Sequence, residues 1–371
     1  MDQPVLRILK EALNVQSIEA SHDPILCRID RYIRRRVSAA LSDFLRDPIS
    51  DTAIGGECSH ATQSRREMAM HMGAGADPDD TNLVFVATYT DAPSAPPTCA
   101  IVVIRGTDVD TGDIWGIIRQ AFEDFTVIFQ STPPWLSSDS GVYVADGTLV
   151  GLETIQALTS GNQSLLNYLE AYLTNPANEN PVLVVAGHSL GGCLTTVTAP
   201  WLSSAFAQDG VKSPIVPATF AAPTAGNQAF ADYYTSTFPY CPRYYNSMDI
   251  APDAWSNLDA VYSLYDQCGV DLPDAVLVGL DRMIGLMDVF DVSYAQQSSM
   301  NAPLPGTCDP LNPLADWFTE AGYQHGTGTY MALLGGESVV LPPNLVDQRR
   351  PRRRIIRHRL QSHFKERLAK S

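Results

Sequence analysis

Two continuous apolar runs dominate the pattern of hydrophobic and polar positions along this chain. They cover residues 100–104 (AIVVI) and 182–186 (VLVVA). Because neither run alternates with polar residues, each predicts a strand buried on both faces, as in a parallel sheet covered by helices. Residues 84–89 are expected to pair with residues 100–104 as a hairpin, across a proline-rich connection at 91–97. The pattern predicts an α/β fold with a mostly parallel central sheet flanked by helices.

A strand, a glycine-flanked turn and a helix are predicted in succession at residues 182–206. The second apolar run leads into Gly187-His188-Ser189-Leu190-Gly191, and a helix-compatible segment begins at Leu190. This is a G-x-S-x-G nucleophile elbow in the strand–turn–helix context that it requires. The two glycines leave room for a strained turn that lifts the serine hydroxyl off the end of the sheet. Ser189 is therefore the candidate nucleophile, against the plainer interpretation of a glycine-rich turn with an idle serine.

A serine nucleophile needs a histidine to take its proton and a carboxylate to orient that histidine. With this elbow the expected chain order is serine, acid, histidine. Apart from two histidines in a basic tail, only His325 lies downstream of Ser189. Asp249 is the candidate acid because it follows a predicted strand at 243–246, and open α/β sheets place their sites at the carboxyl ends of strands. Asp253 is close enough in sequence to compete.

Two further segments are candidates for binding the reacting group. The backbone N–H groups of Leu190 and of Thr107, in the loop after the first apolar run, are the candidate oxyanion donors. A short helix is predicted next, and its apolar face includes Ile114, Trp115, Ile117 and Ile118. That face fits a core helix equally well as a lid, a substrate-binding element that covers the site in water and turns toward a lipid surface.

Five segments together resemble the class 3, fungal-type lipases of the α/β-hydrolase superfamily. The likeness spans about residues 80–335 and rests on 103–107 (VIRGT), 187–192 (GHSLGG), 219–227 (TFAAPTAGN), 245–252 (YNSMDIAP) and 323–325 (YQH). The resemblance implies an α/β-hydrolase fold, a triad of Ser189, Asp249 and His325, and an oxyanion hole at Thr107. It also implies hydrolysis of acylglycerols or related esters. Neither a metal nor a cofactor is expected.

The chain departs from the pattern of that family at several positions. Ala221 stands where the family usually has glycine, and Thr224 where it usually has arginine. Pro200 falls inside the helix predicted after the nucleophile and is expected to kink or shorten it. About 75 residues separate Asp249 from His325, so an insertion is expected at about 260–310.

Three parts are expected along the chain: an N-terminal helical and loop extension at 1–80, an α/β-hydrolase lipase domain at 81–347, and a basic amphipathic tail at 348–371. Within the extension, residues 26–45 predict an amphipathic helix. The tail places four apolar residues on one helix face: Ile356, Leu360, Phe364 and Leu368. Three interpretations of the tail stay open. It docks on the acidic body, binds an anionic membrane surface, or is disordered or binds a partner such as nucleic acid.

Charge is distributed unevenly between these parts. Residues 67–347 hold 5 Lys and Arg against 31 Asp and Glu, whereas residues 348–371 hold ten basic residues and one acidic residue. An acidic body repels nucleic acid, so nucleic-acid binding is not expected as the main function. Contact with a lipid interface is expected through the lid and the tail. The chain shows neither an apolar run of about 18 residues nor a secretory signal pattern. We therefore expect a cytoplasmic protein, with signal-independent export or a removed leader as alternatives.

The seven cysteines show no metal-ligand spacing. Free buried cysteines are the first expectation. One disulfide among Cys241, Cys268 and Cys308 is the alternative, in a pairing that the sequence does not give. Cys193 is expected to pack behind the nucleophile.

Together these features predict a serine-triad carboxylic ester hydrolase, foremost a lipase that hydrolyses acylglycerols through an acyl-enzyme intermediate. Three alternatives stay open. The first is a phospholipase A1 or a short-chain carboxylesterase, the second a catalytically inactive binding protein on a hydrolase fold, and the third a membrane-targeted toxin or effector.

Overall fold

The computed structural model describes residues 66–73, 83–90, 97–106, 114–123, 126–178, 181–298, 300–310 and 316–335. Its strands are β1 Arg66–Gly73, β2 Leu83–Thr90, β3 Pro97–Ile104, β4 Gln130–Ser131, β5 Val144–Ala145, β6 Thr159–Ser160, β7 Gln163–Ser164, β8 Val182–His188, β9 Ile215–Phe220, β10 Pro242–Asn246 and β11 Met300–Leu304. Its α-helices are α3 Ile114–Glu123, α4 Asp146–Ala157, α5 Leu165–Leu173, α6 Leu190–Asp209, α7 Gln228–Thr237, α8 Asp274–Val289, α9 Trp317–His325 and α10 Thr327–Leu333. Its 3-10 helices are η1 Pro176–Asn178, η2 Ala251–Asp253, η3 Leu258–Ser263 and η4 Asp266–Cys268.

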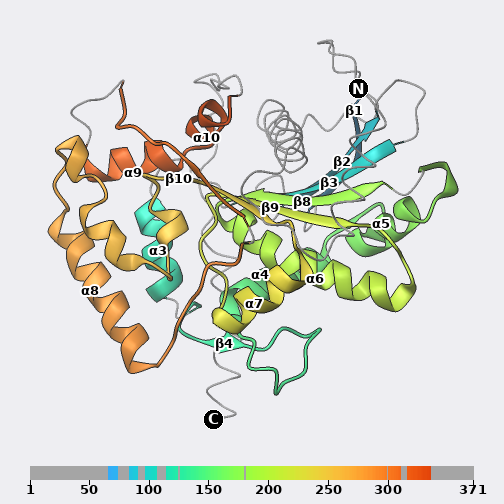
Figure 1. The fold of residues 1–371 in the computed structure, drawn as a ribbon, viewed down its shortest axis with the longest axis horizontal. Helices are drawn as coiled ribbons and strands as arrows, with labels where there is room; N and C mark the ends of the chain where they lie inside the picture. Colours follow the sequence, from blue (N-terminus) through green and yellow to red (C-terminus); the bar gives the residue numbers. More distant parts are fainter. Residues whose placement is uncertain are drawn as a thin grey trace.

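A nine-stranded mixed sheet runs through the centre of the described residues, in the order β11-β10-β9-β8-β3-β2-β1-β6-β7 (Figure 1). The strands from β11 to β3 are parallel to one another. From β3 to β7 each strand is antiparallel to its neighbour. The fold is therefore an α/β-hydrolase fold with a mostly parallel core, as the sequence predicts.

The two apolar runs form β3 and β8, which lie side by side, with Ile104 opposite Gly187. Successive residues of a strand point to opposite faces of the sheet. Val102 and Ile104 accordingly pack in one hydrophobic cluster, whereas Ile101 and Val103 pack in another on the opposite face. Both faces are covered, which explains why neither run alternates with polar residues. The predicted hairpin is also confirmed, because β2 pairs with β3 in antiparallel register.

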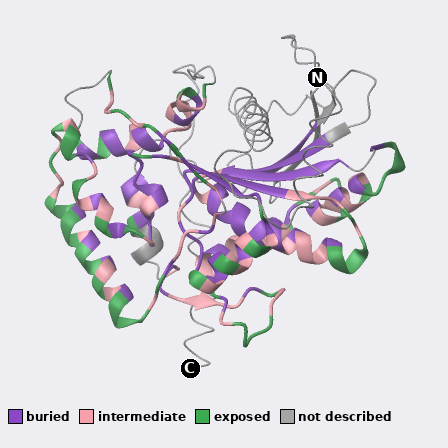
Figure 2. Ribbon diagram, in the orientation of Figure 1, coloured by how far each residue is buried: buried purple, intermediate pink, exposed green. Residues whose placement is uncertain are grey.

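Helices cover both faces of this sheet. The cluster on one face includes apolar side chains of α4, α5, α6 and α7, which lie below the sheet in Figure 1. The cluster on the other face includes Tyr330 of α10. Figure 2 shows the buried sides of α4 to α7 turned toward the strands and their exposed sides turned outward. This two-sided packing fixes the carboxyl ends of the parallel strands, where the site forms.

A third hydrophobic cluster joins α3, α8 and α9 to the turn that follows β10. It includes Trp115 of α3, Ile250 after β10, Leu280 of α8 and Trp317 of α9. A disulfide between Cys268 and Cys308 links the segment before α8 to the segment after β11. The expectation of free cysteines is therefore wrong for these two residues, and the alternative of one disulfide in this region is confirmed. No helix in the described ranges is long and apolar enough to cross a bilayer.

The structure differs from the sequence-based expectations at three places. The sheet begins at β1, before the expected domain boundary at residue 81, and β1 pairs with β2 along its length. The expected insertion at 260–310 contains η3, η4 and α8, but its last part is β11, a strand of the central sheet. Helix α6 runs through Pro200 to Asp209, so the expected shortening does not occur. The one backbone hydrogen bond that Pro200 cannot make is tolerated because the helix is held by buried residues before and after it, such as Ala199 and Leu202.

Several predictions fall on residues outside the described ranges. They concern the amphipathic helix at 26–45, the tail at 348–371 and the oxyanion residue Thr107.

Candidate active site

The turn between β8 and α6 holds Ser189 in a strained conformation. Ser189 has φ 60° and ψ −128°, in a region that side chains with a Cβ rarely adopt. The Ser189 N–H donates to the Phe220 carbonyl at 2.9 Å, and the Cys193 N–H donates to the Ser189 carbonyl at 3.1 Å. These two bonds anchor the turn to β9 on one side and to α6 on the other. The hydroxyl is thereby presented beyond the end of the sheet.

Glycines make this turn possible because β3, β8 and α6 approach one another closely. A Cβ on Gly191 would lie 2.1 Å from the Ile104 carbonyl oxygen of β3. A Cβ on Gly187 would lie 2.3 Å from the backbone of Gly191. Real Cβ atoms do not come this close to backbone atoms, so both positions exclude any residue with a side chain.

Gly191→Ala is expected to lower the free energy of unfolding by about 2–3 kcal/mol, because the new methyl group meets rigid backbone of β3. Gly285→Ala is the matched control, since Gly285 is also a helical glycine but has open space where its Cβ would stand. The control is expected to change stability by less than about 1 kcal/mol. Urea unfolding of the two variants measures the difference. Equal stability of Gly191→Ala and wild type would contradict this account of the elbow.

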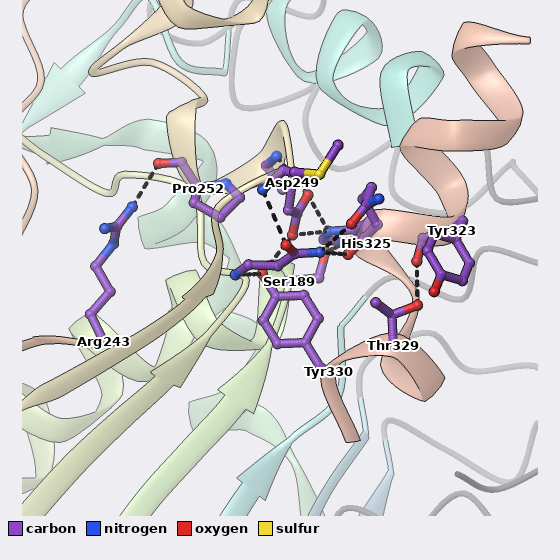
Figure 3. Close-up of polar contacts among 12 residues, drawn as sticks. Ser189, Arg243, Asp249, Pro252, Tyr323, His325, Thr329 and Tyr330 are labelled. Carbon is purple, nitrogen blue, oxygen red and sulfur yellow. Dashed lines mark hydrogen bonds and ion pairs between the residues drawn. The ribbon is translucent and has the colours of Figure 1, made fainter. Parts of the chain in front are cut away.

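Three polar side chains from separate segments contact one another in series: Ser189, His325 and Asp249 (Figure 3). His325 Nε2 lies 2.8 Å from Ser189 Oγ. The other ring nitrogen, Nδ1, lies 2.9 Å from Oδ2 and 3.0 Å from Oδ1 of Asp249. A carboxylate only accepts, so Nδ1 carries the proton and Nε2 is left as the acceptor for the Ser189 hydroxyl. The geometry is that of a serine whose proton can pass to a histidine held in one tautomer.

Asp249 is the acid that reaches His325, and Asp253 is not. The Asp249 carboxylate also accepts from the Tyr330 hydroxyl at 2.7 Å and from the Ala251 N–H at 3.0 Å. Asp253 accepts instead from the Asn257 side-chain amide at 2.9 Å, and burial raises the pKa of Asp253. Of the two candidate acids, Asp249 is therefore the one placed against His325, and its role as the acid stays a prediction.

Tyr330 links Asp249 to β10. Its hydroxyl accepts from the Asn246 N–H at 2.9 Å while it donates to Asp249. Burial, and then the nearby charge of Asp249, raise the pKa of Tyr330 well above 10. Tyr330 therefore keeps its proton and holds the carboxylate in place at every physiological pH.

A buried amide and carboxylate network supports His325 from behind. The Asn246 side-chain amide donates to the carbonyl and side-chain oxygens of Gln324, at 2.9 and 2.6 Å. Gln324 in turn donates to Glu320 Oε1 at 2.6 Å and to the Thr307 carbonyl at 2.7 Å. Neither these residues nor Tyr330 are predicted as site residues from the sequence. The only signal is that Asn246 and Gln324 stand inside the two motif segments that carry Asp249 and His325.

His188, beside the nucleophile, packs against two other rings of the site. Its ring centroid lies 4.9 Å from that of His325 and 5.1 Å from that of Tyr330. Burial, and then the charge of His325, lower the pKa of His188 well below 6.5. His188 therefore stays neutral, so it adds no second positive charge when His325 takes a proton.

This shift of the His188 pKa has a consequence for stability. Below pH 6.5 the unfolded chain binds a proton at His188 and the folded chain does not, so the free energy of unfolding falls as the pH drops through this range. One such proton contributes at most about 1.4 kcal/mol per pH unit. His188→Phe is expected to reduce the acid-induced loss of stability between pH 6.5 and 5. Chemical denaturation at half-unit pH intervals measures it, and identical slopes for variant and wild type would refute the assignment.

Leu190, one of the two candidate oxyanion donors, lies at the same turn. Leu190 is the first residue of α6, where backbone N–H groups have no acceptor within the helix. Gly106, next to Thr107, passes so close that a Cβ there would lie 3.1 Å from the Ser189 Cβ. Gly106 thus passes beside the nucleophile. The roles of Leu190 and Thr107 stay predictions.

The residues of the predicted lid lie on α3, and its apolar face is covered. Ile114, Trp115 and Ile118 are buried and Ile117 is partly buried. Trp115 packs edge-on against Trp317 of α9, with ring centroids 5.9 Å apart, and its ring fills the space beside Gly279 of α8. This packing is compatible with both interpretations, a core helix and a lid in its covered position.

The two departures from the family pattern have visible consequences. Ala221 has φ 51°, in the left-handed region where glycine is favoured. Thr224 is buried, and its hydroxyl donates to Ser256 at 2.8 Å. Both residues belong to the turn after β9 that lies against the elbow.

Cys193 is also buried, its sulfur 3.5 Å from Thr148 Oγ1, and burial raises the pKa of the Cys193 thiol to about 11. Cys193 is therefore better suited to fill space behind the nucleophile than to act as a reactive thiol.

The fold and the site define an α/β-hydrolase with a serine–histidine–aspartate arrangement. Residues 101–258 match the family model described as Lipase (class 3), so this part of the chain is similar to the class 3 lipases. The predicted resemblance is confirmed.

Two known proteins show the same likeness. Lipase ZK262.3 of Caenorhabditis elegans is 26% identical over 166 residues, which is 45% of this chain and 35% of that protein. The chain thus spans about a third of the length of this curated relative. The crystal structure of M37 lipase superimposes with a TM-score of 0.61 at 28% identity, over 73% of this chain and 79% of that one.

Proposed function

We propose that this protein hydrolyses carboxylic esters, with Ser189 as nucleophile, His325 as base and Asp249 as the orienting acid, and that acylglycerols are its substrates. The observation that carries the proposal is the continuous buried contact from Ser189 Oγ to His325 and from His325 to Asp249. A serine in an ordinary turn has no reason to sit in a strained conformation opposite an oriented imidazole.

In the acylation step, Ser189 Oγ attacks the ester carbonyl carbon while its proton passes to His325 Nε2. The imidazolium is stabilised by Asp249, whose carboxylate is held by Tyr330 and by the Ala251 N–H. The Leu190 N–H and the positive end of α6 stabilise the oxyanion that forms. The C–O bond to the alcohol then breaks, and the leaving alcohol takes the proton from His325. The product is an ester between Ser189 and the acyl chain.

In the deacylation step, His325 Nε2 takes a proton from a water molecule as the water oxygen attacks the acyl carbon. The same donors stabilise the second oxyanion. The bond from the acyl carbon to Ser189 Oγ breaks, Oγ recovers the proton from His325, and the fatty acid leaves. No redox partner or metal takes part in this sequence of bonds.

The choice of acylglycerols rests on similarity. The matched family model and both compared proteins carry the name lipase.

A substrate panel tests the proposal. Triglycerides, phosphatidylcholine and p-nitrophenyl esters of graded chain length are offered to the full chain. We expect turnover of the soluble esters, and a rate on triglyceride that jumps above its solubility limit. Smooth saturation would make the enzyme a soluble-ester esterase, and preference for phosphatidylcholine would make it a phospholipase A1. Either result would overturn the acylglycerol assignment, and no turnover of any ester would overturn the hydrolase assignment.

A further inference from the structure

The side chain of Asn246 links the two segments that carry Asp249 and His325. Its amide nitrogen donates to the backbone carbonyl and side-chain oxygens of Gln324, at 2.9 and 2.6 Å. Its amide oxygen accepts from the Met248 N–H at 3.1 Å. Gln324 directly precedes His325, and Met248 directly precedes Asp249. One buried amide thus fixes the backbone beside both triad residues, which lie 76 positions apart in the chain.

Gln324 and Glu320 are themselves held by the short segment around Cys308. The Gln324 side-chain amide donates to the Thr307 carbonyl at 2.7 Å. The Asp309 N–H donates to both carboxylate oxygens of Glu320, at 3.1 and 3.2 Å. Gln324 also donates to Glu320 at 2.6 Å, and both side chains are almost fully buried. The backbone on each side of Cys308 therefore supplies a partner to one member of the network.

The disulfide between Cys268 and Cys308 fixes this segment to η4. Cys268 Sγ lies 4.0 Å from Glu320 Oε1, so the disulfide lies beside the network. Both of its cysteines are only partly buried, whereas the other three described cysteines are buried. The disulfide is therefore open to a reductant in water, while the network that it holds is shielded from water.

We propose that the Cys268–Cys308 disulfide is a redox switch for the turnover of this hydrolase. The proposal rests on the proposed function, since turnover of an ester is what the switch controls. A dithiol reductant supplies two electrons and two protons: the S–S bond breaks, two protein thiols form, and the dithiol closes to a cyclic disulfide. Thr307 and Asp309 are then no longer tied to η4.

Release of this segment weakens the support of His325. Without the Asp309 N–H, the buried Glu320 carboxylate loses the donor that binds both of its oxygens. A buried charge with too few partners is unfavourable, so the last turn of α9 rearranges. His325 ends this helix and shifts with it. A displacement of about 1 Å is enough to slow a catalysed reaction by about 100-fold.

The experiment compares the two redox states of the full chain on soluble p-nitrophenyl butyrate. On reduction with dithiothreitol we expect kcat to fall about tenfold while KM stays within about twofold, because His325 acts in both chemical steps but does not bind the ester. Removal of dithiothreitol and addition of glutathione disulfide are expected to restore kcat. A thermal melt of each state is expected to show a folded chain at the assay temperature.

Cys268→Ser with Cys308→Ser is the matched variant for the reduced state. It is expected to show the same lower kcat without reductant, and to be unaffected by dithiothreitol. An effect of dithiothreitol on this variant would assign the switch to other cysteines, such as Cys27 and Cys58 outside the described residues, and would overturn the proposal.

Gln324→Met tests the network with the disulfide intact. Methionine has about the length of glutamine but no amide to donate to Glu320 or Thr307. We expect kcat to be about tenfold lower in the oxidised state, and reduction to lower it further by less than about twofold, because the disulfide acts through the side chain that is missing. Gln297→Met is the control. Gln297 is also buried but lies outside the network, so this variant is expected to respond to dithiothreitol as the wild type does.

Three other results would overturn the proposal: equal kcat in the two redox states, a loss of kcat that coincides with unfolding, or full additivity of Gln324→Met and reduction. The second result would make the disulfide a purely structural crosslink. Absence of ester turnover in the oxidised wild type would instead count against the proposed function.

Discussion

Replacing Ser189 with alanine is expected to reduce p-nitrophenyl ester turnover by about 10,000-fold or more while the protein stays folded. The substitution removes the oxygen atom that lies 2.8 Å from His325 Nε2. It leaves the backbone bonds of Ser189 to Phe220 and Cys193 unchanged. Alanine tolerates the positive φ of this turn about as well as serine does, so little stability is at stake. Initial rates together with a thermal melt measure both effects.

Ser203→Ala is the matched control for this substitution, because Ser203 lies on the same helix, α6, and is only partly buried. It is expected to keep wild-type turnover. Ester turnover in Ser189→Ala at more than a few per cent of the wild-type rate would show that another group is the nucleophile.

Asp249→Asn is expected to lower turnover by about 10,000-fold as well. An asparagine amide can donate to His325 Nδ1, which would then carry no proton and would leave the proton on Nε2. The ring could no longer accept the proton of Ser189. The effect should appear in kcat, since Asp249 has no contact with bound ester in the proposed mechanism. Steady-state kinetics on a soluble ester measure it.

Asp253→Asn is the control, four residues away on the same turn. Asp253 bonds to Asn257 and not to His325, so we expect turnover within a few-fold of wild type. The reverse pattern, with Asp253→Asn inactive and Asp249→Asn active, would reassign the acid.

The central part of the fold could be predicted from the sequence because local pattern decides it. Strands β3 and β8 are apolar on both faces, and their runs are visible without any knowledge of neighbours. Strand β1 is not predicted from the sequence, because it falls in a segment whose composition is typical of a loop. Its alternating methionines, Met68, Met70 and Met72, are the signal that could have found it. Strand β11 contains Pro303 and only five residues, so its place at the sheet edge depends on its partner β10.

The three proposed triad residues could be predicted because motif, chain order and position relative to strands leave few alternatives. Their supporting network could not. The supporting role of these polar residues depends on hydrogen bonds between segments up to 84 positions apart: Tyr330, Asn246, Gln324 and Glu320. A sequence shows such residues without their partners. The pairing of Cys268 with Cys308 was open for the same reason, as was the choice between Asp249 and Asp253.

Ser189 combines a strained backbone conformation with close packing between β3 and α6. Ser189 takes its unusual backbone conformation because β3 and α6 leave no other path, and the glycines at 187 and 191 permit that path. The unfavourable energy of this backbone conformation is offset by the packing of the buried core on both sides of the sheet. The hydroxyl is consequently fixed relative to His325, which comes from a different part of the chain.

The most direct test of the proposed nucleophile is covalent labelling with a fluorophosphonate, in which the serine oxygen bonds to phosphorus and fluoride leaves. We predict one label per chain on the peptide that contains Ser189, as located by mass spectrometry. Labelling of His325→Ala should be at least about 100-fold slower, because the hydroxyl then lacks its base. Absence of label on Ser189, or equally fast labelling of His325→Ala, would contradict the proposal that Ser189 is activated by His325.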